Sequence, residues 1–223
     1  MPGRITPIVT NEIYHVFNRG INRQPTFVDK WNYQRAVEAI SFYRFLKPPI
    51  KLSKFLILEK SKKNDLLNGL KNQELLVEIF CYCFMPNHFH FLLKQKRDGG
   101  IAKFLSNVQN SYTRYFNTRH KRDGSLFLDQ FKAVRIETDE QFLHVSRYIH
   151  LNPYTGYVVK SFEDLEKYPW SSFSSYINKE NNLFVNTNQI LDFFKTSVAY
   201  KKFVFDQADY QRRLKEIEHL ALE

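Results

Sequence analysis

The sequence contains few cysteines and no long hydrophobic run, and each absence excludes a class of protein. Its 223 residues include two cysteines, Cys81 and Cys83, which are two positions apart on one expected strand. That spacing is badly suited to a disulfide between them, so we interpret both as small core thiols of an intracellular protein. No apolar stretch reaches the roughly 20 residues that cross a bilayer, and no apolar signal-peptide segment follows Met1. We therefore expect a cytoplasmic protein with no membrane partner.

Acidic residues are scarce in one long segment of the chain. The whole sequence has 33 Lys and Arg residues against 23 Asp and Glu residues, which gives a formal net charge of +10. Between residues 94 and 135, ten basic residues stand against three acidic ones, so this segment alone carries +7. One interpretation is an ordinary solvated helix face whose basic residues only keep the protein soluble, but such a face usually carries both positive and negative charges. A segment in which nearly all the charges are positive instead favours a surface that binds phosphate groups.

A pair of histidines lies inside the most apolar stretch, CYCFMPNHFHFLLKQ at 81–95. Successive side chains of a strand point to opposite faces, so His88 and His90 share one face. Two imidazoles about 7 Å apart on a strand suit a divalent metal if a third ligand comes from elsewhere. One alternative is that both are half-buried strand histidines that hydrogen bond to neighbouring residues. A second alternative is a zinc site in which Cys81 and Cys83 join the two histidines, although the break at Pro86-Asn87 makes it hard to assume that the cysteines and the histidines share a face.

Hydrophobic periodicity predicts alternating strands and helices. Asp29 and Thr138 are expected to cap two helices, with Gln141 completing a capping box at the second. Pro153 is expected to end that second helix at or before Asn152. The segment 51–72 does not favour one structure. The expected strands are 12–20, 74–84, the histidine segment, 125–128 and 131–136, and the expected helices are 29–46, 101–119, 138–152, 188–195 and 199–222. A linker is expected at 178–182.

The helix after Thr138 supplies the ligand that the histidine pair lacks. Tyr148 and Asn152 are four residues apart, so they lie on one face of the helix, and His144 lies one turn earlier. An amide oxygen at Asn152 would complete a metal site with the two histidines and would place the Tyr148 hydroxyl beside a bound phosphate. The alternatives are a core tyrosine and an asparagine that caps the helix. His15 on the first strand is interpreted as a lone strand histidine, with a contact near the site as its alternative.

Five blocks of sequence occur in a fixed order along the chain. They are YHVFNRG (14–20), CYCFMPNHFHFLLK (81–94), GSLFLDQFKAVRI (124–136), YIHLNP (148–153) and YPWSSF (168–173). Taken together, they resemble the REP-associated tyrosine transposases. These are single-tyrosine HUH transposases of insertion-sequence type, where HUH denotes His, hydrophobic, His. The resemblance covers roughly residues 5–177 and leaves the rest of the chain unassigned.

The resemblance implies a fold, a division of the chain and a site. The expected fold is α+β, a ferredoxin-like α/β sandwich whose central antiparallel sheet carries the HUH histidines, plus C-terminal helices. We expect a transposase domain over 1–177 and a C-terminal helical extension over 178–223. By resemblance, Tyr148 is the catalytic nucleophile, and His88, His90 and Asn152 hold the metal.

The implied activity is cleavage and rejoining of single-stranded DNA next to an imperfect hairpin, of the REP palindrome kind. A tyrosine with an ordinary pKa near 10 is a weak nucleophile at neutral pH. A divalent cation compensates by polarising the scissile phosphate, and mixed nitrogen and oxygen ligands suit Mg²⁺ or Mn²⁺. A 5′-phosphotyrosine and a free 3′-OH would result. The protein would act as a monomer or homodimer. The candidate DNA contacts are Arg114, Tyr115, Arg119, Lys121, Arg122, Lys132 and Arg135.

Two other function classes remain open. One is a sequence-specific DNA-binding protein that does not cut, and the presence of all three ligands with the tyrosine argues against it. The other is an HUH nickase of replication-initiator type, which would share the chemistry without transposition. A single candidate tyrosine, instead of a pair, favours the transposase.

Overall fold

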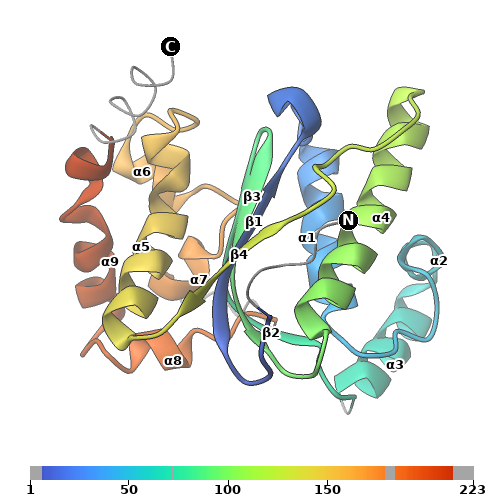
Figure 1. Ribbon diagram of the computed structural model, residues 1–223, viewed down its shortest axis with the longest axis horizontal. Coiled ribbons are helices and arrows are strands. Elements are labelled where there is room, and N and C mark those ends of the chain that lie inside the picture. Colours follow the sequence, from blue (N-terminus) through green and yellow to red (C-terminus); the bar gives the residue numbers. More distant parts are fainter. Residues whose placement is uncertain (1–6, 72, 179–183, 213–223) are drawn as a thin grey trace.

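The computed structural model describes residues 7–71, 73–178 and 184–212. The start of the chain, most of the predicted linker and the end of the predicted helix 199–222 lie outside them. Within the described residues, a four-stranded antiparallel sheet stands between two layers of helices (Figure 1). No helix among them is long and apolar enough to cross a membrane.

The sheet contains β1 (Ile13–Arg19), β2 (Val77–Met85), β3 (His88–Gln95) and β4 (Lys132–Ile136). Their spatial order is β2-β3-β1-β4, and each neighbouring pair is antiparallel. One helical crossover separates β1 from β2, and another separates β3 from β4. This is the βαββαβ arrangement of a ferredoxin-like sandwich, and the predicted α+β fold is confirmed.

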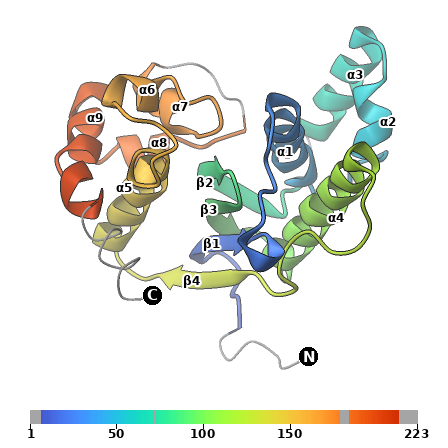
Figure 2. The same ribbon diagram turned by 90° about the horizontal axis from the view of Figure 1, so that it is seen from above.

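One face of the sheet is covered by α1 (Lys30–Tyr43) and α4 (Gly100–His120). Asp29 caps α1 as predicted, since its carboxylate accepts hydrogen bonds from the amides of the first turn. Outside this layer lie α2 (Leu52–Leu56) and α3 (Lys60–Lys71), so the undecided segment 51–72 is largely helical. Figure 2 shows these helices together on one side of the sheet.

The other face is covered by α5 (Asp139–Thr155), with α7 (Phe173–Ile177) and α9 (Ser197–Phe205) packed around it. The short helices α6 (Phe162–Glu166) and α8 (Asn188–Leu191) complete this layer (Figure 2). The predicted helix 188–195 is therefore shorter than expected.

Strand alternation divides the buried side chains of the described residues into two cores. On β1 and β3, Tyr14, Val16, Phe89 and Phe91 point toward α1 and α4 and join the first core. Leu92 points toward α5 and joins the second core, which also contains both cysteines. Buried residues of α8 and α9 belong to that second core as well. The division of the chain near residue 178 stays a prediction.

Two of the predictions about helices and strands are wrong, in each case because of packing against distant parts of the chain. Pro153 does not end its helix, because α5 runs on to Thr155. A proline inside a helix costs about 3 kcal/mol, and the burial of the whole last turn offsets that cost. Residues 125–128 do not form a strand. They make one bridge, from Phe127 to Gly20, and are apolar because Leu126 and Phe127 fill the first core.

The segment Tyr168-Pro169-Trp170 packs its aromatic rings against the rest of the protein. The Tyr168 hydroxyl donates to the Phe84 carbonyl at 2.8 Å, and Trp170 stacks on Tyr33 with ring centroids 5.0 Å apart. The segment therefore closes the end of the sheet beside β2.

Candidate active site

His88 and His90 lie on the face of β3 that is turned toward α5. Their rings are nearly perpendicular, with centroids 5.1 Å apart. The Nδ1 atom of His88 lies 2.6 Å from Oδ1 of Asn87, which can only accept a hydrogen bond. His88 therefore carries its proton on Nδ1, and Nε2 is the nitrogen that would ligate a metal.

His15 fixes the second histidine from the neighbouring strand. Its Nε2 lies 2.9 Å from Nδ1 of His90, and the two rings stack at 5.1 Å. Burial lowers the pKa of His15 to about 4, so the ring is neutral at neutral pH and its Nε2 is able to accept. Assigning the proton to Nδ1 of His90 again leaves Nε2 as the ligating atom. Metal-binding histidines in proteins are commonly oriented in this way, so the alternative interpretation of His15 is the correct one.

Tyr148 reaches the histidines from α5. Its ring meets the ring of His90 edge-on at 5.4 Å and the ring of His15 at 5.7 Å, and 37% of the residue is exposed. The cap at the start of α5 determines the direction in which the helix runs. The Gln141 amide donates to Thr138 Oγ1 at 3.2 Å, and Gln141 Oε1 accepts from the Glu137 amide at 2.8 Å. This cap turns the chain directly from β4 into α5, which then crosses the face that carries the histidines.

Asn152 lies one turn beyond Tyr148 and is fully buried. Its Nδ2 donates to the Tyr148 carbonyl at 2.9 Å, which identifies Oδ1 as the acceptor atom of the amide. β4 ends at Ile136 beside Ile13, and α5 then returns toward the opposite end of β1, where Arg19 pairs with His88. Asn152 therefore extends the site toward the His88 end of β3. It does not cap the helix, because Gly156 holds that position.

His88 and His90 supply only two metal ligands, so a divalent metal would also need a ligand such as the side-chain amide of Asn152. Among the described residues, no group of three His, Cys, Asp or Glu side chains is placed to hold a metal ion. The zinc alternative on the cysteines finds no support, because burial raises the pKa of the Cys81 thiol and so disfavours the ligating thiolate. His144 turns away from the site, contacts Arg147 and lies against Phe203 of α9.

The face that carries the histidines also presents two cations. Arg19 is exposed and pairs with His88 across the strands, so their side chains point to one side. Lys132, a predicted DNA contact, pairs with Phe17 on the same side. Arg19 was missed by the sequence analysis. The alternation that puts Tyr14, Val16 and Asn18 on one face of β1 was the signal that could have found it.

The other predicted DNA contacts lie away from Tyr148. Arg135 pairs with Tyr14 on the opposite face and is bound by Glu12 at 2.9 Å. The rest of the set belongs to α4 and the turn after it, in the layer on the other side of the sheet (Figure 2). These residues are Arg114, Tyr115, Arg119, Lys121 and Arg122.

The other tyrosines of α4 and α5 lie away from the histidines. Tyr112 is buried in the first core, and its hydroxyl donates to the Thr26 carbonyl at 2.6 Å. Tyr115 lies beneath the guanidinium of Arg35 on the far layer. Tyr154 belongs to α5, contrary to expectation, but its hydroxyl bonds to Asp209 at 3.3 Å. None of these three rings contacts either histidine among the described residues.

Comparison with known proteins finds one family that resembles the middle of the chain. The family model described as IS200-like transposases matches residues 54–152, a range that contains both histidines, Tyr148 and Asn152. This match supports a transposase function, and the resemblance predicted from the sequence blocks is confirmed.

A particular relative is found among solved structures. A REP-associated tyrosine transposase bound to a REP hairpin has a TM-score of 0.51 to this chain and 16% sequence identity. The match covers 84% of this chain and 90% of the other. At this identity the likeness establishes the fold. Among curated proteins, no sequence matches this chain significantly.

Proposed function

We propose that this protein is a DNA strand transferase that cleaves single-stranded DNA beside a hairpin through a 5′-phosphotyrosine on Tyr148. One observation carries the proposal: the ring of Tyr148, on α5, meets the ring of His90, one of the paired histidines of β3. The family match supplies the reaction class. The hairpin substrate follows the solved relative, whose DNA is a REP hairpin.

The residues divide the work as follows. Attack by the Tyr148 hydroxyl oxygen forms an O–P bond and breaks the bond from phosphorus to the 3′ oxygen. The tyrosine loses its proton, and the departing oxygen takes one up as a free 3′-OH. The phosphodiester is exchanged for a phosphotyrosine of similar energy, so a new 3′-OH is able to reverse the step without an external energy source.

The remaining groups orient the reactants. His88, His90 and Asn152 would hold Mg²⁺ or Mn²⁺, which polarises the scissile phosphate and offsets the negative charge of the transition state. His15 and Asn87 keep the imidazoles in the ligating tautomer. Arg19 and Lys132 attract the DNA phosphates to this face, and the partial exposure of Tyr148 admits a strand from solvent.

The test uses hairpin DNA with a single-stranded flank, taken from around the gene of this protein and labelled at either end. With Mg²⁺ or Mn²⁺ present, a 3′-end label should enter a protein adduct that survives denaturation. A 5′-end label should be released on a shorter strand that ends in 3′-OH. Cleavage without an adduct would indicate a hydrolytic nuclease, and binding without cleavage would indicate a DNA-binding protein.

Strand transfer is tested on the adduct itself. Adding a second strand with a free 3′-OH should move the 3′-end label from the protein into a longer DNA. An adduct that never returns its DNA to an acceptor strand would contradict the proposed transferase activity while leaving the nickase alternative in place.

A further inference from the structure

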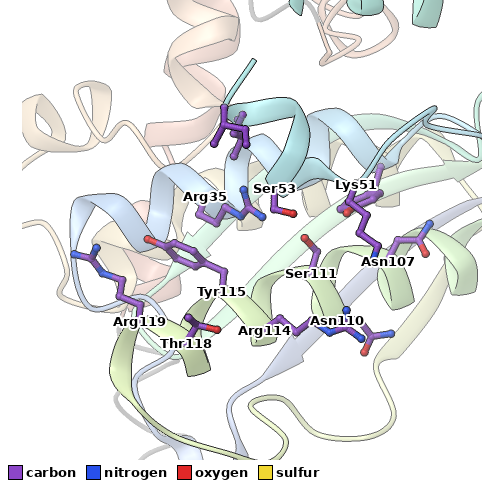
Figure 3. A pocket seen from close by; sticks show the side chains of 13 residues that line it. Arg35, Lys51, Ser53, Asn107, Asn110, Ser111, Arg114, Tyr115, Thr118 and Arg119 are labelled. Atoms are coloured by element: carbon purple, nitrogen blue, oxygen red, sulfur yellow. The ribbon is translucent and has the colours of Figure 1, made fainter. Parts of the chain in front are cut away.

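Tyr115, the one aromatic residue among the predicted DNA contacts, lies on the layer opposite Tyr148. It lines a hollow of about 660 Å³ between α1, α2 and α4, where the guanidinium of Arg35 lies 5.4 Å from the centroid of its ring (Figure 3). The sheet stands between this hollow and α5 (Figure 2). Tyr115 is therefore not placed to hold the base of the nucleotide whose phosphate Tyr148 would attack.

Phe17 is a partly exposed aromatic residue on the face of the sheet that carries the histidines. It lies within β1 and pairs with His90 on one side and with Lys132 on the other. Directly opposite residues of antiparallel strands point to the same face, with Cβ atoms about 4.5–5.5 Å apart. The side chain of Phe17 therefore lies in one row with a histidine of the pair and a cation.

Packing in the interior does not account for Phe17. Among the described residues, it belongs to neither hydrophobic core and is not one of the partly buried residues that pack against them. Ile13, on the same face of β1, does pack against the second core. The ring of Phe17 instead contacts His15 and His90, with centroids 4.9 Å and 5.5 Å apart. Apolar surface of this ring is left in solvent, where its burial by a ligand would be favourable.

Two cations flank Phe17. Arg19 follows it two residues later on the same face of β1, and Lys132 lies opposite it on β4. Both are exposed, and neither forms an ion pair with another residue that the structure describes. An aromatic ring between two cations suits a single nucleic-acid strand, whose base stacks on the ring while its phosphates contact the charges.

Phe17 and Tyr148 share their ring neighbours. The ring of Tyr148 meets the same two histidines, His15 at 5.7 Å and His90 at 5.4 Å. A base against Phe17 would therefore adjoin both the proposed metal site and the nucleophile. A base inside a duplex is stacked on its neighbours and has to be unstacked before it is able to contact a protein ring. An unpaired base meets no such cost.

We propose that Phe17 is a stacking site for one unpaired base beside the scissile phosphate, and that it thereby favours cleavage of single-stranded over duplex DNA. That this phosphate is the one attacked by Tyr148 rests on the proposed function. Arg19 and Lys132 would contact the phosphates on either side of the stacked nucleotide. Because every base has a π face, the site should accept any base and reject an abasic position.

The first experiment compares the ring with an apolar side chain that lacks it. Fluorescence anisotropy measures the affinity of the protein for hairpin DNA with a single-stranded flank, and for the same hairpin with a complement annealed to that flank. Phe17→Leu should lose about tenfold in affinity for the single-stranded form and little for the paired form, whereas Phe17→Tyr should resemble wild type. The salt dependence of binding should be unchanged in Phe17→Leu, because no phosphate contact is removed.

Phe193→Leu is the matched control, since Phe193 is a phenylalanine after α8 that is 47% exposed. It should bind both forms of the hairpin like wild type. Equal losses for the two forms in Phe17→Leu would show that Phe17 only supports the fold, and would overturn the proposal. So would a loss in Phe17→Tyr as large as that in Phe17→Leu.

The second experiment locates the base along the strand. An abasic site is introduced at each nucleotide of the flank in turn, and the affinity is measured for wild type and for Phe17→Leu. At one position the abasic site should cost wild type about tenfold and should cost Phe17→Leu nothing further, because the ring that the base contacts is already absent. Losses that multiply at every position would overturn the proposal.

The base site and the proposed chemistry fail in different ways. If wild type forms adduct, the sensitive position should be one of the two nucleotides that the cleaved bond joins, and a sensitive position elsewhere would overturn the placement beside the scissile phosphate. If wild type forms no adduct but the abasic effect still depends on Phe17, the proposed function fails and the base site stands. If adduct forms and no position depends on Phe17, the reverse holds.

Discussion

Both faces of the sheet bury apolar side chains, but the buried histidines of the described residues lie on one of them. Toward α1 and α4 the core is a cluster of aromatic and aliphatic residues, in which Phe84, Phe89 and Phe91 contact one another and Phe104 contacts Phe91. Toward α5 the interior includes His90, His150, Asn152, Ser146 and Ser172. Burial of apolar surface stabilises a fold without directing a reactive group, whereas buried polar groups must be hydrogen bonded and so fix orientation. Both faces bury apolar clusters that stabilise the fold. The face toward α5, called the polar face below, also holds the groups that orient the candidate site.

The α5 face shows how such orientation is achieved. His150 lies within hydrogen-bond distance of the Tyr200 hydroxyl at 2.7 Å and of Ser172 Oγ at 2.8 Å. Ser172 in turn accepts from the Tyr82 amide at 2.9 Å. These bonds tie α5 to β2, to α9 and to the segment before α7. Since Tyr148 is two residues before His150, they also limit how far the tyrosine is able to shift from the histidines.

The largest expected effect comes from deleting the reactive oxygen on the polar face. Tyr148→Phe should abolish the denaturation-resistant protein–DNA adduct, a loss of at least about 10³-fold. Its thermal unfolding and hairpin affinity should stay close to wild type, because the ring and its contacts remain. The adduct is followed on a denaturing gel with 3′-end-labelled DNA.

Tyr115→Phe on the other layer is the matched control for Tyr148→Phe and should form adduct normally. If Tyr148→Phe still forms adduct while Tyr115→Phe does not, the active tyrosine belongs to α4 and the assignment of the site to the polar face is wrong.

Removal of the proposed metal ligands should have the next largest effect. His88→Ala, His90→Ala or added chelator should reduce cleavage at least about a hundredfold, because the transition-state charge is no longer offset.

His15→Phe should weaken Mn²⁺ affinity by about 10- to 100-fold, since His90 then loses the partner that fixes its tautomer.

Mn²⁺ binding is measured directly by electron paramagnetic resonance, which gives an affinity independent of activity. His120→Phe, at an exposed position at the end of α4, is the matched histidine control. Full cleavage in chelator would contradict metal dependence, and unchanged Mn²⁺ affinity in His15→Phe would contradict its positioning role.

A smaller effect is expected on stability in acid, where the polar face contains a fully buried histidine. Burial lowers the pKa of His150 to about 3, below its ordinary value of 6.5. Between these two values the unfolded chain binds a proton that the folded chain does not, so the free energy of unfolding should fall as the pH falls from 6.5 toward 3. Above pH 6.5 this residue should contribute no pH dependence.

Urea unfolding at a series of pH values measures this dependence. His150→Gln should be less stable than wild type at pH 7 and should show a flatter pH profile. A His150→Gln profile as steep as wild type would assign the acid sensitivity to other groups.

The smallest effect is expected where exposed charges are removed. Replacing Arg119, Lys121 and Arg122 together by Gln should weaken hairpin binding several-fold and flatten its salt dependence, since about 0.7 to 0.9 is lost from the slope per phosphate contact. Lys132→Gln, on the polar face, should lower affinity by less. An unchanged salt slope in the triple variant would show that this end of α4 points away from the DNA.

Much of the candidate site follows from local sequence. Strand alternation is enough to put His88 and His90 on one face, since it depends only on the backbone of one segment. Helical periodicity likewise relates Tyr148 to Asn152, and the side chains of Asp29 and Thr138 mark where α1 and α5 begin. Each of these features is decided by residues a few positions apart, which is why the sequence determines them.

The remainder depended on partners that are distant in the chain. The central positions of β3 and β1 bring His15 and Arg19 beside the histidines, and no local pattern specifies which strands pair or in which register. The continuation of α5 through Pro153 and the folding of 125–128 into the core were also decided by tertiary packing. In each case the free energy of burying side chains against remote segments exceeds a local preference of a few kcal/mol, and that energy exists only once the chain has folded.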